Sequence, residues 1–217
     1  SLNAYKEMGF TRETIINALA LLGWSTENEI FSMNELIKSF NLKNVQKGAA
    51  VFDLKRFNWV SSQHLAKLND DAFIEAIHPF MEDEGIDDVA PNYKEILIAM
   101  RTSKTNLKEI AYATRPFFFE LEEYDEKGVN KFLKGSLETL TFALETLSKI
   151  SEWNETELDM ALINVRDYFN LPIPKVNQPM RIALVGSTIS PSLGLTLELF
   201  GKEKSLERIK KAIDFIS

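Results

Sequence analysis

The sequence predicts an all-α protein. Apolar residues recur three and four positions apart along most of the 217 residues, which is the spacing of one face of an α-helix. Helix-capping residues, glycines and prolines separate these stretches. No stretch shows the apolar–polar alternation of a half-buried strand, and no internal repeat is visible. These observations indicate a protein built from helices.

Capping signals mark the first predicted helices. Thr11 is suited to cap a helix that Gly23 ends. Ser32 and Glu35 have the spacing of a capping box, in which side chain and backbone satisfy each other's free hydrogen-bonding groups. Asp53 is a candidate cap for the segment that follows. These signals predict helices over the first quarter of the chain.

The middle of the chain continues the pattern. Around Trp59 the chain turns into another helix, and the Asn/Asp cluster at 69–71 then ends this pattern and caps the next helix. Pro91 is expected to open a helix at its first position. A further helix over 107–113 is expected to end before Pro116, because proline disfavours helical geometry in the residue before it.

The last hundred residues contain the longest periodic stretches. Helices are predicted at 126–134, 136–149 and 155–169. The connector 171–174 is expected to be extended because two of its residues are prolines. The stretch 177–201 predicts a short helix, a tight loop rich in Gly, Ser, Thr and Pro, and a second helix. A basic amphipathic helix closes the chain.

Domain boundaries are predicted from breaks in this pattern. The Asn/Asp cluster gives the first, so we expect a helical domain over 1–68 and a helical region over 69–217. The acidic run at 120–125 marks a possible subdivision of the second region.

Composition excludes several classes of protein. The chain has no Cys, which excludes disulfide scaffolds and thiolate metal sites and favours a cytoplasmic location. Its only histidines, His64 and His78, do not have metal-ligand spacing, and no phosphate-binding G-x-x-x-x-G-K-[ST] motif occurs. No apolar run reaches the roughly 20 residues of a membrane span. We therefore expect no catalytic residue and no metal site in this chain, and no membrane partner.

Charge is unevenly distributed. The formal net charge is -7, which argues against a broad nucleic-acid-binding surface and against DNA as a partner. Between 174 and 211, however, basic residues outnumber acidic ones, and a local basic field can attract a polyanion. The basic residues of this stretch are Lys175, Arg181, Lys202, Lys204, Arg208, Lys210 and Lys211.

Two segments resemble bacterial glutamyl-tRNA synthetases, which are class I aminoacyl-tRNA synthetases. The first spans 1–25 and includes Met8-Gly9-Phe10 and Leu19 to Ser25, and the match continues through Ala50 to Asp53. The second, from Gln178 to Glu203, looks like the family's anticodon-binding motif. The resemblance covers essentially the whole chain.

This resemblance implies that the chain is the C-terminal half of a glutamate–tRNA ligase. Residues 1–68 would contact the inner side of the tRNA L, and 69–217 would bind the anticodon. The full-length enzyme would use ATP and Mg²⁺ to attach glutamate to tRNA(Glu) in protein synthesis. Because the nucleotide-binding fold and signature lysine loop are absent from the chain, the chain alone should bind no cofactor and should be inactive. We expect a cytoplasmic monomer.

The resemblance also assigns residues to anticodon bases. Arg181 and Leu193 match residues that form the pocket for the first base, and Ser190 and Pro191 match residues that contact the middle base. Arginine offers a planar fork of donors, serine hydrogen-bonds in either sense, and leucine and proline offer flat apolar contact. An ordinary surface salt bridge is the alternative role for Arg181.

The third anticodon base is read in the family by an arginine placed shortly before a helix like 107–111. Ser103 is the nearest match by spacing, and Arg101 lies two residues upstream. Either Arg101 substitutes or this base is read loosely. Since the third base separates glutamate from glutamine tRNAs, one alternative is an enzyme that also or mainly charges tRNA(Gln). The Ser61-Ser62 pair, where the family often has Asn-Gly, is a further departure.

A different class of protein also stays open on the sequence. The acidic helical faces would suit a non-catalytic protein-interaction module that docks a basic partner.

Overall fold

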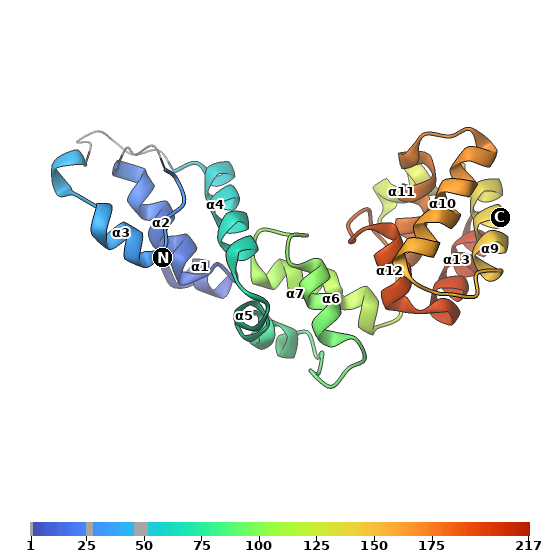
Figure 1. Ribbon diagram of the computed structural model, residues 1–217, viewed down its shortest axis with the longest axis horizontal. Helices are drawn as coiled ribbons and strands as arrows, with labels where there is room; N and C mark the ends of the chain where they lie inside the picture. The colour runs from blue at the N-terminus through green and yellow to red at the C-terminus, as the bar shows by residue number, and fades with distance from the viewer. Residues whose placement is uncertain (1, 25–27, 46–51) are drawn as a thin grey trace. The chain divides into compact units, whose positions relative to one another are not determined.

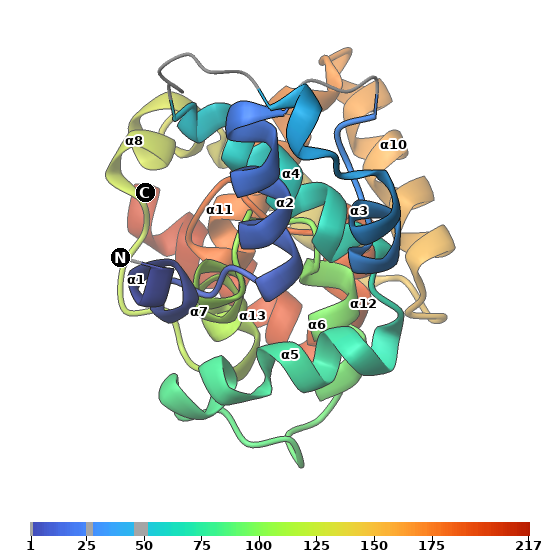
Figure 2. The ribbon, with the colours of Figure 1, turned by 90° about the vertical axis from the view of Figure 1, so that its left-hand side faces the viewer.

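The computed structural model describes residues 2–24, 28–45 and 52–217 (Figures 1 and 2). Within these residues the chain forms thirteen α-helices, and its one β-type contact is an isolated bridge between Trp24 and Val45. The all-α prediction is confirmed. Ser1, Ser25 and the pair Ala50-Val51, which belong to the resembling segments, lie outside the described residues. No described helix is long and apolar enough to cross a membrane.

The chain divides into two compact units, Ser1–Ala113 and Thr114–Ser217. The first unit contains six complete helices, a 3-10 turn and most of a seventh helix. They are α1 (Leu2–Glu7), α2 (Arg12–Gly23), α3 (Met33–Ser39), the turn Leu42–Asn44, α4 (Leu54–Lys67), α5 (Asp70–Asp83), α6 (Tyr93–Met100) and α7 (Leu107–Phe118). The boundaries expected at 68/69 and near 120–125 stay predictions.

The predicted caps are present in the first unit. The Thr11 side chain accepts from the Thr14 backbone N–H, and both bonds of the capping box form between Ser32 and Glu35. Asn69 caps α5 by accepting from the Ala72 N–H. These bonds satisfy backbone donors that have no partner inside the helix.

Three predicted helix boundaries between 53 and 118 are wrong. Asp53 already caps α4, so Trp59 lies inside that helix and does not start it. Helix α6 begins after Asn92, which adopts a left-handed conformation, so Pro91 does not open it. Helix α7 continues through Pro116 to Phe118. Proline removes its own helical N–H donor, and packing can offset that loss.

The N-terminal core of the first unit lies where α2 packs against α4, side by side in Figure 2. One buried cluster joins Trp24 and Phe31 to Leu21, Leu36 and Val60. A second, aromatic cluster forms around Phe10 and Phe57, with ring centroids 4.6 Å apart. Burial of these large apolar side chains stabilises helices that are too short to be stable alone.

The second unit is a bundle of short helices. They are α8 (Glu126–Gly128), the π-helix Val129–Leu133, α9 (Leu137–Ser148), α10 (Glu155–Phe169), α11 (Ile173–Val185), α12 (Leu193–Phe200) and α13 (Lys202–Ile216). Helices α9 to α13 pack around fully buried side chains such as Leu140, Leu158, Met180, Leu197 and Ile209 (Figure 1). This core positions the loop between α11 and α12.

The extended connector predicted over 171–174 is shorter than expected. Helix α11 starts at Ile173, with Pro172 as its N-cap residue. Pro174 is tolerated because the first turn of a helix has no intrahelical partner for its N–H groups. The helix therefore reaches Arg181 with two full turns behind it.

Candidate nucleic-acid interface

Gly186 ends α11 and begins the loop 186–192. Its φ of 75° is a left-handed conformation, which glycine adopts without steric cost. A β-carbon here would lie 3.0 Å from the carbonyl oxygen of Glu123 and 3.3 Å from Leu121. The Gly186 carbonyl accepts from the Asp125 N–H at 2.7 Å. The loop therefore rests on the segment 121–125, and only a glycine fits there.

The other end of the loop is anchored on α10. The Gly194 N–H donates to the Asp159 carboxylate at 3.1 Å, and the Ser192 hydroxyl donates to the Glu155 carboxylate. A β-carbon on Gly194 would lie 2.5 Å from Asp159 Oδ1. Carboxylates thus already occupy the start of α12, so this helix N-terminus is not available to a phosphate group.

Arg181 is held half-buried at the base of the loop. Its Nε donates to Ser190 Oγ at 3.1 Å, and its Nη2 donates to the Pro191 carbonyl at 3.3 Å. Burial lowers the pKa of the guanidinium, but an arginine remains charged at neutral pH. No carboxylate among the described residues pairs with it. The salt-bridge role is therefore not found in the part of the chain that the structure describes.

The guanidinium presents two edges with different roles. Nε and Nη2 form the side edge, which is bound to the loop. Nη1 and the second hydrogen of Nη2 form the end edge, and Nη1 makes no hydrogen bond to a described residue. Two parallel N–H groups suit two adjacent acceptors, such as those on the edge of a nucleobase. The arrangement leaves one fork free to bind such a group.

Ser190 and Pro191 lie in the loop 186–192 and Leu193 begins α12, and the three residues differ in exposure. Ser190 and Pro191 are half-buried beside Arg181. Leu193 is only 2% exposed, so its side chain belongs to the core in this state. The assigned contacts of these residues with anticodon bases stay predictions.

Thr196 is a member of the cluster that sequence reasoning missed. It is fully buried, and its hydroxyl lies 3.1 Å from Ser190 Oγ and 2.9 Å from the Ser192 carbonyl oxygen. A threonine inside the otherwise apolar start of α12 was the available signal, because a buried hydroxyl needs a partner.

Arg101 belongs to the first unit, where it is engaged with its own surroundings. One guanidinium nitrogen donates to the Leu68 carbonyl at 2.9 Å and another forms an ion pair with Asp70. The guanidinium carbon lies 5.0 Å from the centre of the Phe73 ring. The nearby Ser103 hydroxyl is buried and has no hydrogen-bond partner among the described residues. A role for Arg101 at the third base stays a prediction.

Both hydroxyl groups of the Ser61-Ser62 pair donate hydrogen bonds within the protein. Ser61 is fully buried and donates to the Thr105 carbonyl, and Ser62 donates to the carbonyl of Asn58 at 2.9 Å. In this conformation neither hydroxyl hydrogen is free for a partner molecule.

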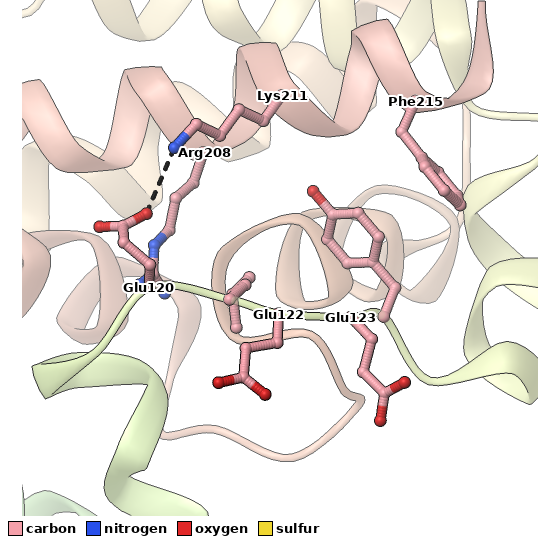
Figure 3. Close-up of a pocket in the computed structure, with 8 residues that line it drawn as sticks. Glu120, Glu122, Glu123, Arg208, Lys211 and Phe215 are labelled. Carbon is pink, nitrogen blue, oxygen red and sulfur yellow. Dashed lines mark hydrogen bonds and ion pairs between the residues drawn. The ribbon is translucent and has the colours of Figure 1, made fainter.

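Several cations of α13 secure the chain internally. Arg208 donates to the carbonyls of Leu184 and Phe119, and Lys204 donates to the carbonyl of Phe117. Lys211 pairs with Glu120, as Figure 3 shows. Some of the basic residues between 174 and 211 therefore bind the segment 117–120 of the protein itself.

The pocket in Figure 3 lies between the segment 120–124 and α13. Its volume is about 310 Å³, and Glu122 and Glu123 at its edge point away from α13. Two hydrogen bonds, to Glu207 and Glu120, raise the pKa of Lys211. Among the described residues, no group of three or more His, Asp or Glu side chains could hold a metal ion.

The chain belongs to the family of anticodon binding domains, whose model matches residues 72–213. A second model, for the catalytic domain of class I tRNA synthetases (E and Q), matches residues 1–59. Curated relatives of the chain include glutamate–tRNA ligases.

Two relatives illustrate the similarity. Glutamate–tRNA ligase 1 of Caldanaerobacter subterraneus subsp. tengcongensis is 32% identical over 225 residues, covering all of this chain and 46% of the relative. Glutamate–tRNA ligase of Legionella pneumophila subsp. pneumophila is 32% identical over 219 residues, covering all of this chain and 47% of the relative. The chain thus spans a little under half the length of these proteins.

Solved structures agree in fold. A glutamate tRNA ligase from Elizabethkingia meningosepticum superposes with a TM-score of 0.79 at 28% identity, covering 98% of this chain and 43% of that one. Glutamate–tRNA synthetase from Elizabethkingia anophelis gives a TM-score of 0.76 at 28% identity, covering 97% and 42%. The resemblance inferred from sequence is confirmed, and neither the tRNA(Gln) enzyme nor the protein-interaction module is favoured.

Proposed function

We propose that this chain is the tRNA-recognition part of a glutamate–tRNA ligase, and that the loop 186–192 with Arg181 binds the anticodon. The observation that carries the proposal is the half-buried Arg181, which pairs with no carboxylate of a described residue and keeps the end edge of its guanidinium unbound by them. Unpaired bases in an anticodon loop can be splayed out and hydrogen-bonded on their edges.

The proposed roles follow from the hydrogen-bonding positions and the apolar surface that each side chain does not use within the protein. Arg181 binds the first anticodon base through its end edge, and Pro191 supplies apolar surface near the middle base. Ser190 contacts the middle base through a hydroxyl lone pair. Leu193 forms the core side of the pocket for the first base. Arg101 is the candidate for the third base, which it could reach only by releasing the Leu68 carbonyl or Asp70.

The whole protein would attach glutamate to tRNA(Glu) in the cytoplasm. That acylation consumes ATP and requires Mg²⁺, and we assign no residue of this chain to either. The proposed protein acts as a monomer and needs neither a DNA nor a membrane partner.

The test is binding of an anticodon stem–loop RNA to wild-type and Arg181→Ala chains. Loss of one bidentate contact should weaken binding by about 1–3 kcal/mol. Lys175→Ala is the matched control, because Lys175 is an exposed cation on the same helix. Equal affinity of wild type and Arg181→Ala, or an equal loss in both variants, would remove Arg181 from the site.

Aminoacylation by the full-length protein tests the reaction. Charging of tRNA(Glu) in preference to tRNA(Gln) is expected. Preference for tRNA(Gln) would contradict the proposed specificity.

A further inference from the structure

The cluster behind Arg181 has a defined hydrogen-bond order. A guanidinium nitrogen can only donate, so Ser190 Oγ must accept from Arg181 Nε. The Ser190 hydroxyl has one hydrogen, and two oxygens lie 3.1 Å from Ser190 Oγ, the Pro191 carbonyl oxygen and Thr196 Oγ1. Thr196 Oγ1 lies nearer to the Ser192 carbonyl oxygen, at 2.9 Å, and a carbonyl can only accept, so the single Thr196 hydrogen points there and Ser190 donates to Thr196 Oγ1. Ser190 therefore accepts from Arg181 and donates to Thr196, and both bonds restrict rotation of its hydroxyl group.

Thr196 is itself fixed from two sides. It is fully buried in the first turn of α12, and its hydroxyl also lies 2.9 Å from the Ser192 carbonyl. A threonine side chain is stiff about its first torsion because two heavy atoms branch from Cβ. Thr196 thus offers Ser190 a hydroxyl whose position depends on the helix and not on the loop.

We propose that Thr196 is a positioning residue of the anticodon pocket, which holds Ser190 so that Ser190 and Pro191 bind the side edge of Arg181 and leave its end edge toward the RNA. The inference rests on the proposed function of Arg181. Without the Thr196 hydroxyl, Ser190 loses the acceptor of its hydrogen and can rotate toward the Pro191 carbonyl. The guanidinium then samples several orientations, and binding must pay the entropy of selecting one.

Thr196→Val tests this idea because valine keeps the shape of threonine and lacks the hydroxyl. Thr196→Ser is the matched control, since it keeps the hydroxyl. Thermal unfolding of both variants shows whether the fold survives. We expect Thr196→Val to bind the cognate anticodon stem–loop about three- to tenfold more weakly, which corresponds to one neutral hydrogen bond, and Thr196→Ser to bind within about twofold of wild type.

A double-mutant cycle separates positioning from a general structural role. If Thr196 acts through Arg181, Thr196→Val should cause no further loss in an Arg181→Ala background. It should also reduce discrimination between stem–loops that differ at the first anticodon base. The same loss in both backgrounds, or unchanged discrimination, would overturn the positioning role.

A measurement without RNA keeps this inference separate from the proposed function. The Nε–H group of Arg181 should give a dispersed, slowly exchanging NMR signal, identified by its disappearance in Arg181→Lys. We expect Thr196→Val to broaden or average this signal and Thr196→Ser to retain it. An unchanged signal in Thr196→Val contradicts the positioning role. If that signal changes but Arg181→Ala binds RNA like wild type, the proposed function fails and the positioning of Arg181 stands.

Discussion

His64 Nε2 lies 2.9 Å from Asn17 Oδ1 in the buried interior of the first unit. The Asn17 amide is oriented by two other bonds, because its Nδ2 donates to the Glu29 carbonyl and its Oδ1 accepts from the Phe31 N–H. Asn17 Oδ1 is therefore an acceptor, and His64 Nε2 must carry the hydrogen. This histidine joins α4 to α2 and to the segment before α3.

Stability of the first unit should fall when His64 is protonated. Burial is the main cause that lowers the pKa of His64 below its ordinary value of about 6.5, while Glu13 opposes the shift. The unfolded chain then binds the proton more readily than the folded one, so the free energy of unfolding decreases as pH falls below about 6.5. The loss stops growing once the pH is below the folded-state pKa.

Urea unfolding measured between about pH 5 and 7.5 checks this prediction. His64→Gln should remove that part of the pH dependence. His78→Gln is the matched control at the second histidine, whose side chain is 40% exposed. An identical pH profile for wild type and His64→Gln would exclude His64 as the cause.

Gly194→Ala should destabilise the second unit by about 1–3 kcal/mol, the usual cost of overpacking. The added methyl group would lie 2.7 Å from the Glu155 carbonyl oxygen, which is backbone and cannot rotate away. Thermal unfolding measures the effect. Gly135→Ala is the control, because a β-carbon there meets nothing within 4 Å, and it should be nearly neutral. Equal melting temperatures for the two variants would contradict the close packing of α12 on α10.

Arg208→Met should cost about 2–4 kcal/mol in the free energy of unfolding, because charge-assisted hydrogen bonds are lost and carbonyls are left unsatisfied. Arg208 is 2% exposed, and its bond to the Phe119 carbonyl measures 2.7 Å. Denaturant unfolding gives the value. Lys210→Met, an exposed cation on the same helix, should be nearly neutral. A neutral Arg208→Met would show that these bonds add no net stability.

Local signals in the sequence predicted much of the helical structure. Thr11, the Ser32–Glu35 box and Asn69 cap the helices that follow them, because each bond spans three residues and needs no distant partner. The loop 186–192 could be found for the same reason, since Gly186 and Gly201 mark where helices stop. The resemblance then added a role for the loop.

Boundaries around proline were harder to predict, because their outcome depends on packing. Helix α7 continues through Pro116, and the next residue, Phe117, stacks on Phe200 with ring centroids 4.6 Å apart. A sequence window around Pro116 does not contain Phe200. The same limit applies to Leu193, whose burial follows from the position of α12 on α10.

The sequence by itself determined which segments become helices, where most of them start, and which loop carries Arg181. Only the tertiary structure decided which edge of the Arg181 guanidinium stays unbound, through the hydrogen bonds of Ser190, Pro191 and Thr196. It also decided that Arg208 holds the carbonyl of Phe119, 89 residues away in the chain. The physical reason is the distance along the chain between interacting groups. A helix cap or an apolar helical face depends on residues within about one turn, whereas the hydrogen bonds of a buried hydroxyl or a buried cation depend on groups that only the folded core brings together.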